Sequence, residues 1–266
     1  MEKKILAIIQ ARSDSKRLPN KVLLEIDKTT VIEKIYHRLS KSRFINKIIV
    51  ATTILSSDDK LCNLLDKKNI RYFRGSVNNV LDRFLKASKQ FNGNIIVRIT
   101  GDCPLIDVKI VDKVINNYVN NKVDYSSNVN PPTFPNGLDV EVFSLALLEK
   151  YKSKISSTFD KEHVTTYFRK NKKIKKINFS SKINYSNLSV TLDDYDDFKK
   201  IMSIFNFFKK KKINYQSLIK YLNKNSANFK EIKNRNDFVD LGIGQKLWKK
   251  AKSIIPGGNM LILKDL

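Results

Sequence analysis

A segment near the N-terminus combines positive charges with small residues in a way that suits phosphate binding. Residues 10–21 read Gln-Ala-Arg-Ser-Asp-Ser-Lys-Arg-Leu-Pro-Asn-Lys and follow an apolar run over Ile5–Gln10. Arginine and lysine side chains, together with the backbone N–H groups of such a loop, can surround a triphosphate. The segment has no glycine and is therefore not a Walker loop. On residue types alone, a solvated charged loop is the competing interpretation.

Two aspartates that follow apolar runs could hold a divalent cation. Asp102 lies in Arg98–Leu105, which reads Arg-Ile-Thr-Gly-Asp-Cys-Pro-Leu, and Asp193 lies in Thr191–Phe198, which reads Thr-Leu-Asp-Asp-Tyr-Asp-Asp-Phe. Carboxylates at strand ends can hold Mg²⁺ against phosphate oxygens, and Gly101 would let the backbone approach a ligand. The alternatives are an ordinary turn around Asp102 and helix capping by the second group of carboxylates.

These segments resemble, in their order, motifs of the cytidylyltransferase family that contains the CMP-sugar-acid synthetases. The branch typified by spore coat polysaccharide biosynthesis protein F is the most similar. The first segment matches Ile-Ile-Gln-Ala-Arg-x-x-Ser-x-Arg-Leu-Pro-x-Lys-x-Leu, and the second matches Arg-Ile-Thr-Gly-Asp-x-Pro-Leu-Ile-Asp. The third departs from the family's Thr-Val-Asp-Thr-Pro-Glu-Asp-Phe, because Asp194-Tyr195 stands in place of Thr-Pro. Segments 74–83, and 131–142 with 162–165, also resemble family stretches, so the resemblance covers about residues 3–205.

The resemblance implies roles for particular residues. Arg12 and Lys21 would face the triphosphate and, with Asp102, take part in catalysis, and Asp102 and Asp193 would hold Mg²⁺ as the cofactor. Contacts with the nucleotide are implied for Gln10, Ala11, Arg12, Arg17, Lys21, Arg74, Ser76, Arg83, Arg98 and Gly101. Contacts with the sugar are implied for Asn128, Asn136, Asp139, Glu141 and His163. On residue types alone, Ser76 would cap a helix and His163 would be a structural histidine.

The activity that the resemblance implies is a nucleotidyl transfer. An oxygen of an acidic sugar of the nonulosonic type would attack the α-phosphate of CTP, which joins CMP to the sugar and releases pyrophosphate for surface polysaccharide biosynthesis. A glycosyltransferase of the same fold is one alternative, but it would normally show an Asp-x-Asp metal motif, which Gly101-Asp102-Cys103 lacks. A non-enzymatic polyanion-binding protein is the other, and it would bind nucleic acid in a salt-sensitive way.

The spacing of apolar residues predicts the framework that must position these segments. Buried parallel strands are predicted at Ile5–Gln10, Lys47–Thr52, Arg71–Arg74 and Asn94–Thr100. Helices are predicted at Val31–Ser42, Asp58–Lys68, Asn79–Phe91 and Asp107–Asn121. A loop over Asp124–Leu138 precedes strands at Leu138–Phe143, Lys175–Phe179 and Leu188–Leu192 and helices at Leu145–Lys152, Asp160–Lys170, Asp194–Phe208 and Tyr215–Asn223.

This order of elements predicts an α/β fold with a mostly parallel sheet and helices on both faces. The resemblance specifies a Rossmann-like three-layer sandwich of the nucleotide-diphospho-sugar transferase type. Ligands of open α/β sheets bind at the carboxyl ends of the strands. We therefore expect the carboxylates of Asp102 and Asp193 to lie at two strand ends, roughly 4–8 Å apart, a span that one hydrated Mg²⁺ can bridge.

Composition narrows the class of partner. Apolar residues make up 41% of the 266 residues, and no apolar run is long enough to cross a membrane. The net charge of +25 raises the question of nucleic acid, but the lysines are spread along the chain and their densest runs lack interleaved aromatic residues. We expect a cytoplasmic enzyme that binds CTP and an acidic sugar, with no nucleic acid and no membrane partner. The resemblance also implies that the protein is a homodimer. The two cysteines do not have the spacing of a disulfide framework or a zinc site.

The C-terminal part of the sequence differs from the rest. We expect residues 1–225 to form the cytidylyltransferase-like catalytic domain and residues 226–266 to form a C-terminal extension. Gly244–Leu261 resembles the extreme N-terminus of class III, PLP-dependent aminotransferases, which implies the remnant of a fusion. An ordinary amphipathic C-terminal helix is the alternative, and no PLP activity is expected.

Overall fold

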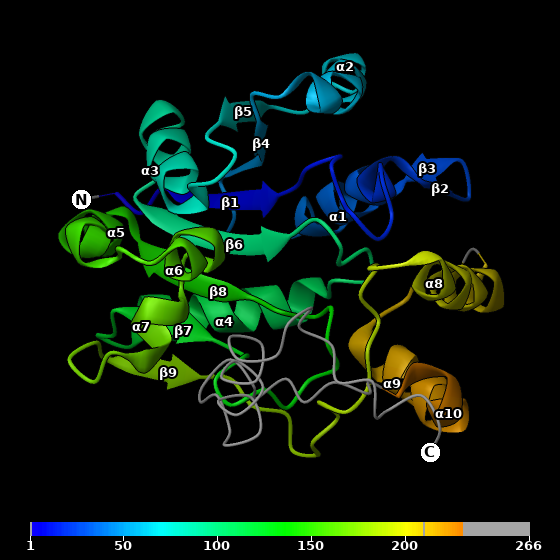
Figure 1. Ribbon diagram of the computed structural model, residues 1–266. Helices are drawn as coiled ribbons and strands as arrows, with labels where there is room; N and C mark the ends of the chain where they lie inside the picture. The colour runs from blue at the N-terminus through cyan, green and yellow to red at the C-terminus, as the bar shows by residue number, and fades with distance from the viewer. Residues whose placement is uncertain (1, 210, 231–266) are drawn as a thin grey trace, which may run out of the picture. The chain divides into compact units, whose positions relative to one another are not determined.

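The computed structural model describes residues 2–209 and 211–230, and a central sheet of seven strands organises them (Figure 1). The order of the strands is β5-β4-β1-β6-β8-β7-β9. The strands are β1 (Ile5–Gln10), β4 (Lys47–Thr53), β5 (Tyr72–Gly75), β6 (Ile95–Thr100), β7 (Tyr125–Ser127), β8 (Glu141–Ser144) and β9 (Lys176–Asn178). All neighbours pair in parallel except β8, which runs antiparallel to β6 and β7. A small hairpin of β2 (Glu25–Ile26) and β3 (Thr29–Thr30) stands apart from this sheet.

Helices cover both faces of the sheet, as their apolar spacing predicts. The helices are α1 (Val31–Leu39), α2 (Asp59–Lys67), α3 (Val80–Gln90), α4 (Val108–Asn120), α5 (Leu145–Tyr151), α6 (Thr158–His163), α7 (Thr166–Lys170), α8 (Tyr195–Phe208), α9 (Tyr215–Lys224) and α10 (Ser226–Phe229). Three short 3₁₀ turns are η1 (Lys21–Leu23), η2 (Ser56–Asp58) and η3 (Lys152–Lys154). The predicted α/β fold with a mostly parallel sheet is confirmed.

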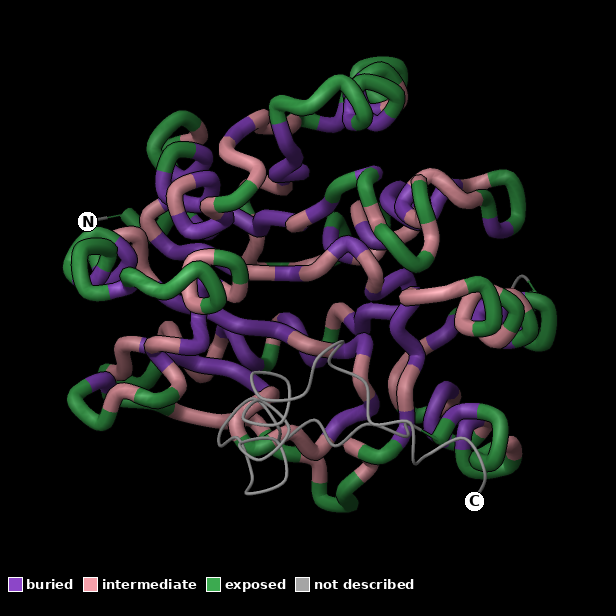
Figure 2. Tube along the Cα trace, viewed as in Figure 1, coloured by how far each residue is buried: buried purple, intermediate pink, exposed green. Residues whose placement is uncertain are grey.

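Strand β1 shows how the sheet produces two cores. Ile5, Ala7 and Ile9 belong to a core that also holds residues of α1, α4 and α8, whereas Leu6 and Ile8 belong to a core with residues of α3, α5 and α7. Successive side chains of a strand point to opposite faces, so a strand that is apolar at every position is covered on both. Figure 2 shows the consequence: buried residues follow the strands, and exposed residues follow the outer sides of the helices.

Three predicted segments are wrong. The loop predicted over Asp124–Leu138 contains β7, whose three residues are too few to give a periodic pattern. The strand predicted at Leu188–Leu192 does not form. Its backbone N–H groups donate to carbonyls of three separate segments, at Asn136, Phe229 and Asp102, and not to one neighbouring strand. The single helix predicted at Asp160–Lys170 is two helices, because the chain turns sharply at Val164, where φ is 60°.

The chain order reverses beside β1, and this places the predicted segments together. β4 and β5 follow on one side of β1 and β6 lies on the other, so the ends of β1 and β6 form a topological switch point. Gln10 and Thr100 are partners in the register, and the N–H of Gly101 donates to the carbonyl of Gln10 at 2.8 Å. A Cβ on Gly101 would lie 2.9 Å from the Cβ of Ala11. Gly101 is therefore required for the close approach of the two loops, a reason that the sequence did not reveal.

The predicted C-terminal extension is described over its first five residues alone. Residues 226–230 hold α10, and the ring of its buried Phe229 lies 5.9 Å from the ring of Tyr221 on α9. The remainder, including Gly244–Leu261, lies outside the described residues. Within residues 2–209 and 211–230, no helix has the length and apolar character needed to span a membrane.

Candidate active site

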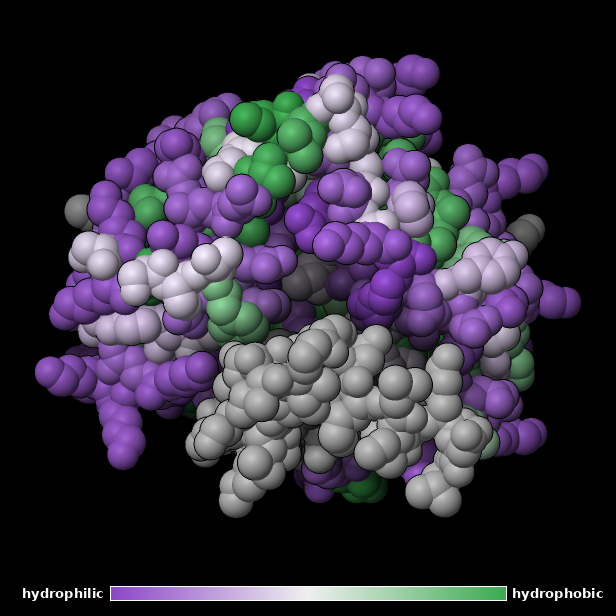
Figure 3. Space-filling view, in the orientation of Figure 1, coloured by the Kyte–Doolittle hydropathy of each residue, from purple (hydrophilic) through white to green (hydrophobic). Residues whose placement is uncertain are grey.

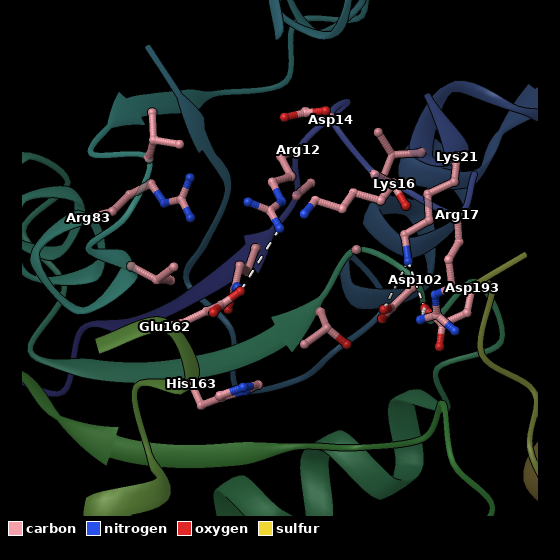
Figure 4. A pocket seen from close by; sticks show the side chains of 18 of the residues that line it. Arg12, Asp14, Lys16, Arg17, Lys21, Arg83, Asp102, Glu162, His163 and Asp193 are labelled. Carbon is pink, nitrogen blue, oxygen red and sulfur yellow. Dashed lines mark hydrogen bonds and ion pairs between the residues drawn. The ribbon is translucent and has the colours of Figure 1, made fainter. Parts of the chain in front are cut away.

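A cavity of about 660 Å³ opens at the ends of β1 and β6 (Figure 4). Its lining includes five cationic side chains, those of Arg12, Lys16, Arg17, Lys21 and Arg83. Figure 3 shows hydrophilic side chains along the upper and right borders of a hollow in the middle of the viewed face. Figure 4 shows a division within the cavity: Lys21, Arg17, Asp102 and Asp193 lie together at one end and Arg83 lies at the other. Such a cavity suits an elongated ligand that carries several negative charges.

The side chain of Lys21 joins three segments at the first end of the cavity. Its Nζ donates to Asp102 Oδ2 at 3.3 Å, to Asp193 Oδ1 at 3.0 Å and to the carbonyl of Leu192 at 2.8 Å. Arg17 Nη2 also lies 3.0 Å from Asp193 Oδ1. Asp102 Oδ2 and Asp193 Oδ1 both contact Lys21 Nζ, so the distance between these two oxygens cannot exceed the sum of their distances to Nζ. This separation agrees with the predicted convergence of Asp102 and Asp193.

Backbone contacts hold this arrangement. The N–H of Leu192 donates to the carbonyl of Asp102 at 2.9 Å, so Asp193 is fixed beside the end of β6 even though its segment is not a strand. Asn20, in the left-handed region at φ 57°, turns the first loop into η1 and begins it at Lys21. The Lys21 side chain is 14% exposed.

The charges at this end of the cavity stabilise one another. Burial opposes the charge of Lys21, but Asp102 and Asp193 raise its pKa above the ordinary value. Burial likewise opposes the charge of Asp102, and the Lys21 ammonium lowers the pKa of that carboxyl below its ordinary value. Both groups are therefore charged at neutral pH.

The second end of the cavity presents a buried cation. Arg83, on the first turn of α3, is 2% exposed, and its Nε and Nη1 have no hydrogen-bond partner among the described residues. Burial, and then the nearby charge of Arg12, lower the pKa of Arg83 to about 10, so it stays protonated at neutral pH. An unpaired buried guanidinium is costly unless a ligand supplies the missing acceptors. Arg83 is thus suited to bind an anion or a carbonyl group in the cavity.

Asp58, which the sequence analysis did not single out, anchors the first loop. It is fully buried, and its Oδ1 accepts from the N–H of Ser13 at 2.6 Å. Its Oδ2 accepts from Thr52 Oγ1 at 2.8 Å, from the N–H of Thr53 at 3.0 Å and from Thr53 Oγ1. Burial opposes the charge, but these donors lower the pKa of Asp58. Its sequence position suggested the start of a helix, and its loop partner lies 45 residues away, which no local pattern reveals.

We expect Asp58→Asn to destabilise the fold by about 2–3 kcal/mol. The asparagine NH2 group would face hydrogen-bond donors that the carboxylate of Asp58 now accepts from. The lowered pKa means that the charged form stabilises the fold above the unfolded pKa and that this stabilisation is lost as pH falls through the folded pKa. Urea unfolding at pH 7 and at lower pH measures both effects. Asp59→Asn is the matched control, because Asp59 is half exposed and pairs with Arg74. Equal losses in both variants would contradict the anchoring role.

A buried polar cluster contains two residues that were predicted to contact ligands. Arg98 forms an ion pair with Glu141 and donates to Gln10 Oε1 at 3.1 Å. Glu141 also accepts from the hydroxyls of Tyr125 at 2.5 Å and Thr165 at 2.6 Å. Neither Arg98 nor Glu141 lines the cavity in the described structure. Their contacts show that they tie β6, β8 and the start of α7 together.

Five further predicted residues lie outside the cavity lining. Arg74 donates to the carbonyls of Thr53 and Leu55. Ser76 accepts from the N–H of Asn79, but Asn79 and not Ser76 caps α3, so the capping role that the residue type of Ser76 favours is wrong. Asn128 is buried and bonds to the backbone of Leu138 and Val140. Asn136 and Asp139 are also absent from the lining of the described cavity.

The remaining predicted residues come together in one place. They are Gln10, Ala11, Arg12, Arg17, Lys21, Arg83, Gly101, Asp102, His163 and Asp193, and all line the cavity. The structure adds Asp14, Lys16, Thr158 and Glu162, which the site prediction did not include. Lys16 and Glu162 are direct sequence neighbours of Arg17 and His163, so the motifs that identified those residues could have indicated them as well. Glu162 Oε1 lies 4.0 Å from Arg12 Nη2 across the cavity.

Comparisons with known proteins point to one family. A family model described as cytidylyltransferase matches residues 6–239. An uncharacterized protein of Methanocaldococcus jannaschii is 38% identical over 239 residues, which are 89% of this chain and 96% of the relative. Spore coat polysaccharide biosynthesis protein SpsF of Bacillus subtilis is 32% identical over 210 residues, which are 76% of this chain and 86% of the relative.

A shorter match and a solved structure extend this similarity. A 3-deoxy-manno-octulosonate cytidylyltransferase of Solibacter usitatus is 33% identical over 118 residues, covering 43% of this chain and 45% of the relative. The structure of a cytidylyltransferase from Leptospira borgpetersenii superposes with a TM-score of 0.82 at 34% identity, covering 88% of this chain and 99% of that one. The family match ends at residue 239, before Gly244–Leu261, so it gives the aminotransferase resemblance no support.

Proposed function

The chain belongs to the cytidylyltransferase family and is a nucleotidyltransferase, and we propose that it joins CMP from CTP to an acidic sugar of the nonulosonic type. The reaction releases pyrophosphate and serves surface polysaccharide biosynthesis, in the cytoplasm and as a homodimer. The observation that carries the proposal is the convergence of Lys21, Asp102 and Asp193 at one end of a cavity rich in cations. Phosphoryl transfer depends mainly on positioning and on charge stabilisation, which such an arrangement supplies.

The nucleotide occupies the length of the cavity in this proposal. Arg12, Arg17 and Lys21 stabilise the charge of the triphosphate, and the arginines give it paired hydrogen bonds. Arg83, with its unpartnered nitrogens, receives an oxygen of the same nucleotide at the other end. Gln10, Ala11 and Gly101 contribute the walls between these ends.

Asp102 and Asp193 are suited to hold Mg²⁺. Both offer hard oxygen ligands from one end of the cavity, and they lie close enough for one ion. The described residues contain no group of three or more His, Cys, Asp or Glu side chains that could hold a metal. Mg²⁺ commonly binds through one or two carboxylates together with substrate phosphates and water, so a pair of carboxylates is sufficient. When bound, the ion neutralises charge on the phosphate oxygens.

The acceptor sugar binds beside α6 in this proposal. His163 and Glu162 line that side of the cavity (Figure 4), and His163 is the one predicted sugar contact that does so. The names of two relatives support an acidic sugar and a polysaccharide pathway, since one is a spore coat polysaccharide biosynthesis protein and the other a 3-deoxy-manno-octulosonate cytidylyltransferase.

Pyrophosphate release tests the proposal directly. Each of the four ribonucleoside triphosphates is incubated with Mg²⁺ and with each member of a panel of sugar acids and sugar phosphates. We expect release with CTP and a sugar acid, and little with either alone. If pyrophosphate were released with a sugar phosphate and not with a sugar acid, the acceptor would be a sugar phosphate. Hydrolysis of a nucleotide sugar without CTP turnover would favour a glycosyltransferase.

We expect Arg12→Ala to weaken CTP binding about 10- to 100-fold, because a charged hydrogen bond contributes about 1.5–3 kcal/mol. Stability should change little, since Arg12 lies in a loop and its partner Glu162 is half exposed at 4.0 Å. Titration calorimetry with CTP and a thermal melt measure the two effects. Arg43→Ala, at an exposed arginine outside the cavity, is the control. Wild-type affinity in Arg12→Ala would remove Arg12 from the nucleotide site.

A further inference from the structure

His163 is held in the cavity by an unusual turn. It ends α6, and Val164 follows with φ 60° and ψ −52°. The N–H of Thr165 donates back to the carbonyl of His163 at 2.6 Å, which makes a three-residue γ-turn. A β-branched residue at positive φ is strained, and strain of this kind persists only where the surroundings enforce it.

The surroundings of the turn enforce it from both sides. Val164 is fully buried in the core that covers one face of the sheet. The Thr165 hydroxyl donates to Glu141 Oε1 at 2.6 Å, and Glu141 is fixed by Arg98 and Tyr125. The ring of Phe159 lies 4.3 Å from the ring of His163. The core therefore fixes the backbone at the end of α6, and the exposed ring of Phe159 lies beside the imidazole that this backbone carries.

The charges that face His163 come from four elements. Arg98 lies on β6, Arg169 on α7, Glu141 on β8, and Glu162 and Asp160 on α6 itself. Burial, and then Arg98, lower the pKa of His163, and Arg169 acts in the same direction, while Glu162 and Glu141 oppose it. The net shift is below the ordinary value of 6.5, so the imidazole is neutral and able to accept a proton at neutral pH.

We propose that His163 is the general base that takes the proton from the attacking hydroxyl of the acceptor, an inference that rests on the proposed function. The acceptor oxygen forms a bond to the α-phosphorus of CTP, and the bond from that phosphorus to the bridging oxygen breaks, so pyrophosphate leaves with the electron pair. The hydroxyl proton passes to a ring nitrogen of His163 and then to water. Among the groups that line the cavity, imidazole is a stronger base than a carboxylate.

The pH dependence of turnover tests this role. In the wild type, kcat/KM should fall on the acid side with a midpoint below 6.5, as His163 becomes protonated. His163→Gln should lower kcat at least about a hundredfold and abolish this acid limb, while the affinity for CTP and the melting temperature stay close to those of the wild type. Added imidazole should restore part of the activity of His163→Ala. His37→Gln is the matched control, because His37 is the other histidine of the chain and is exposed on α1.

Several outcomes would overturn the assignment. If His163→Gln kept the acid limb, or raised only the KM for the sugar, His163 would be a sugar contact and not a base. The two histidines also give separable imidazole NMR signals once each variant is available. A His163 midpoint well above neutral pH would contradict the neutral imidazole that this role requires. If the wild type released no pyrophosphate with any acceptor, the proposed function itself would fail, which is distinct from a wild-type enzyme that does not need His163.

Discussion

Replacing Asp102 or Asp193 by asparagine should lower CTP-dependent turnover by about a hundred- to ten-thousandfold, because charge stabilisation by a metal contributes several kcal/mol to the transition state. The variant removes one charged ligand and creates no cavity. Steady-state pyrophosphate release and binding of Mn²⁺ in the presence of CTP measure the two losses. Asp196→Asn is the control, because Asp196 is an exposed residue of α8 that pairs with Lys199.

The fold should survive either substitution. From the sequence alone, the two carboxylates would face and repel each other, so that removing one could add stability. The structure places the Lys21 ammonium between them, and each variant leaves Lys21 with the other partner. We therefore expect a small loss of stability instead. Wild-type turnover and metal affinity in both variants would disprove the two-carboxylate site.

The second large effect concerns Glu141, whose carboxylate is buried with Arg98 and Arg169 and two hydroxyl donors. Glu141→Gln should destabilise the fold by about 3–5 kcal/mol, because it leaves two largely buried guanidinium groups without their counter-charge. Urea unfolding at pH 7 measures this loss. Glu149→Gln is the matched control, since Glu149 is an exposed residue of α5 that pairs with Lys89, and it should change stability by less than about 0.5 kcal/mol.

The same residue gives stability a pH dependence. Burial opposes ionisation, but Arg98 and then Arg169 lower the pKa of Glu141 from 4.5 to about 2. A carboxyl with a depressed folded pKa stabilises the fold above its unfolded pKa, and this stabilisation is lost as pH falls toward the folded pKa. The wild type should therefore lose stability between about pH 4.5 and 2, and Glu141→Gln should lose less over that window. If Glu141→Gln instead kept full stability and raised the KM for the sugar, the original prediction of a sugar contact would be correct.

The sequence predicted most of the framework because its elements are long and strongly patterned. β1 and β6 are apolar at nearly every position, and α1, α3 and α4 repeat at helical spacing, so local pattern alone located them. β7 was missed because three residues set no period. The helix break at Val164 was missed because no glycine or proline marks it in the sequence. Only the tertiary contacts of Thr165 and Val164 hold the turn in place.

The site was predictable where its residues share a loop, and not where they depend on distant partners. Arg12, Arg17 and Lys21 stand in one loop after β1, so a motif was enough to group them. Glu141 and Asn128 are buried polar residues near that loop's end of the sheet, and they bond to other parts of the chain. A sequence does not distinguish such residues from buried polar residues that bind a ligand. Asp58 is the converse case, since its effect on the first loop depends on a contact that only the folded chain makes.

The lysine between the two carboxylates has a consequence for the order of binding. In the free enzyme the acidic pair already holds a cation of its own, at 3.3 and 3.0 Å. A divalent ion that enters alone must compete with that ammonium, whereas one that arrives with a triphosphate offers the ammonium a new anionic partner. Each ligand thereby favours the other, and linkage requires the effect to be mutual. We therefore expect the proposed site to bind the metal and the nucleotide cooperatively, and the two carboxylates to bind few divalent ions while no nucleotide is present.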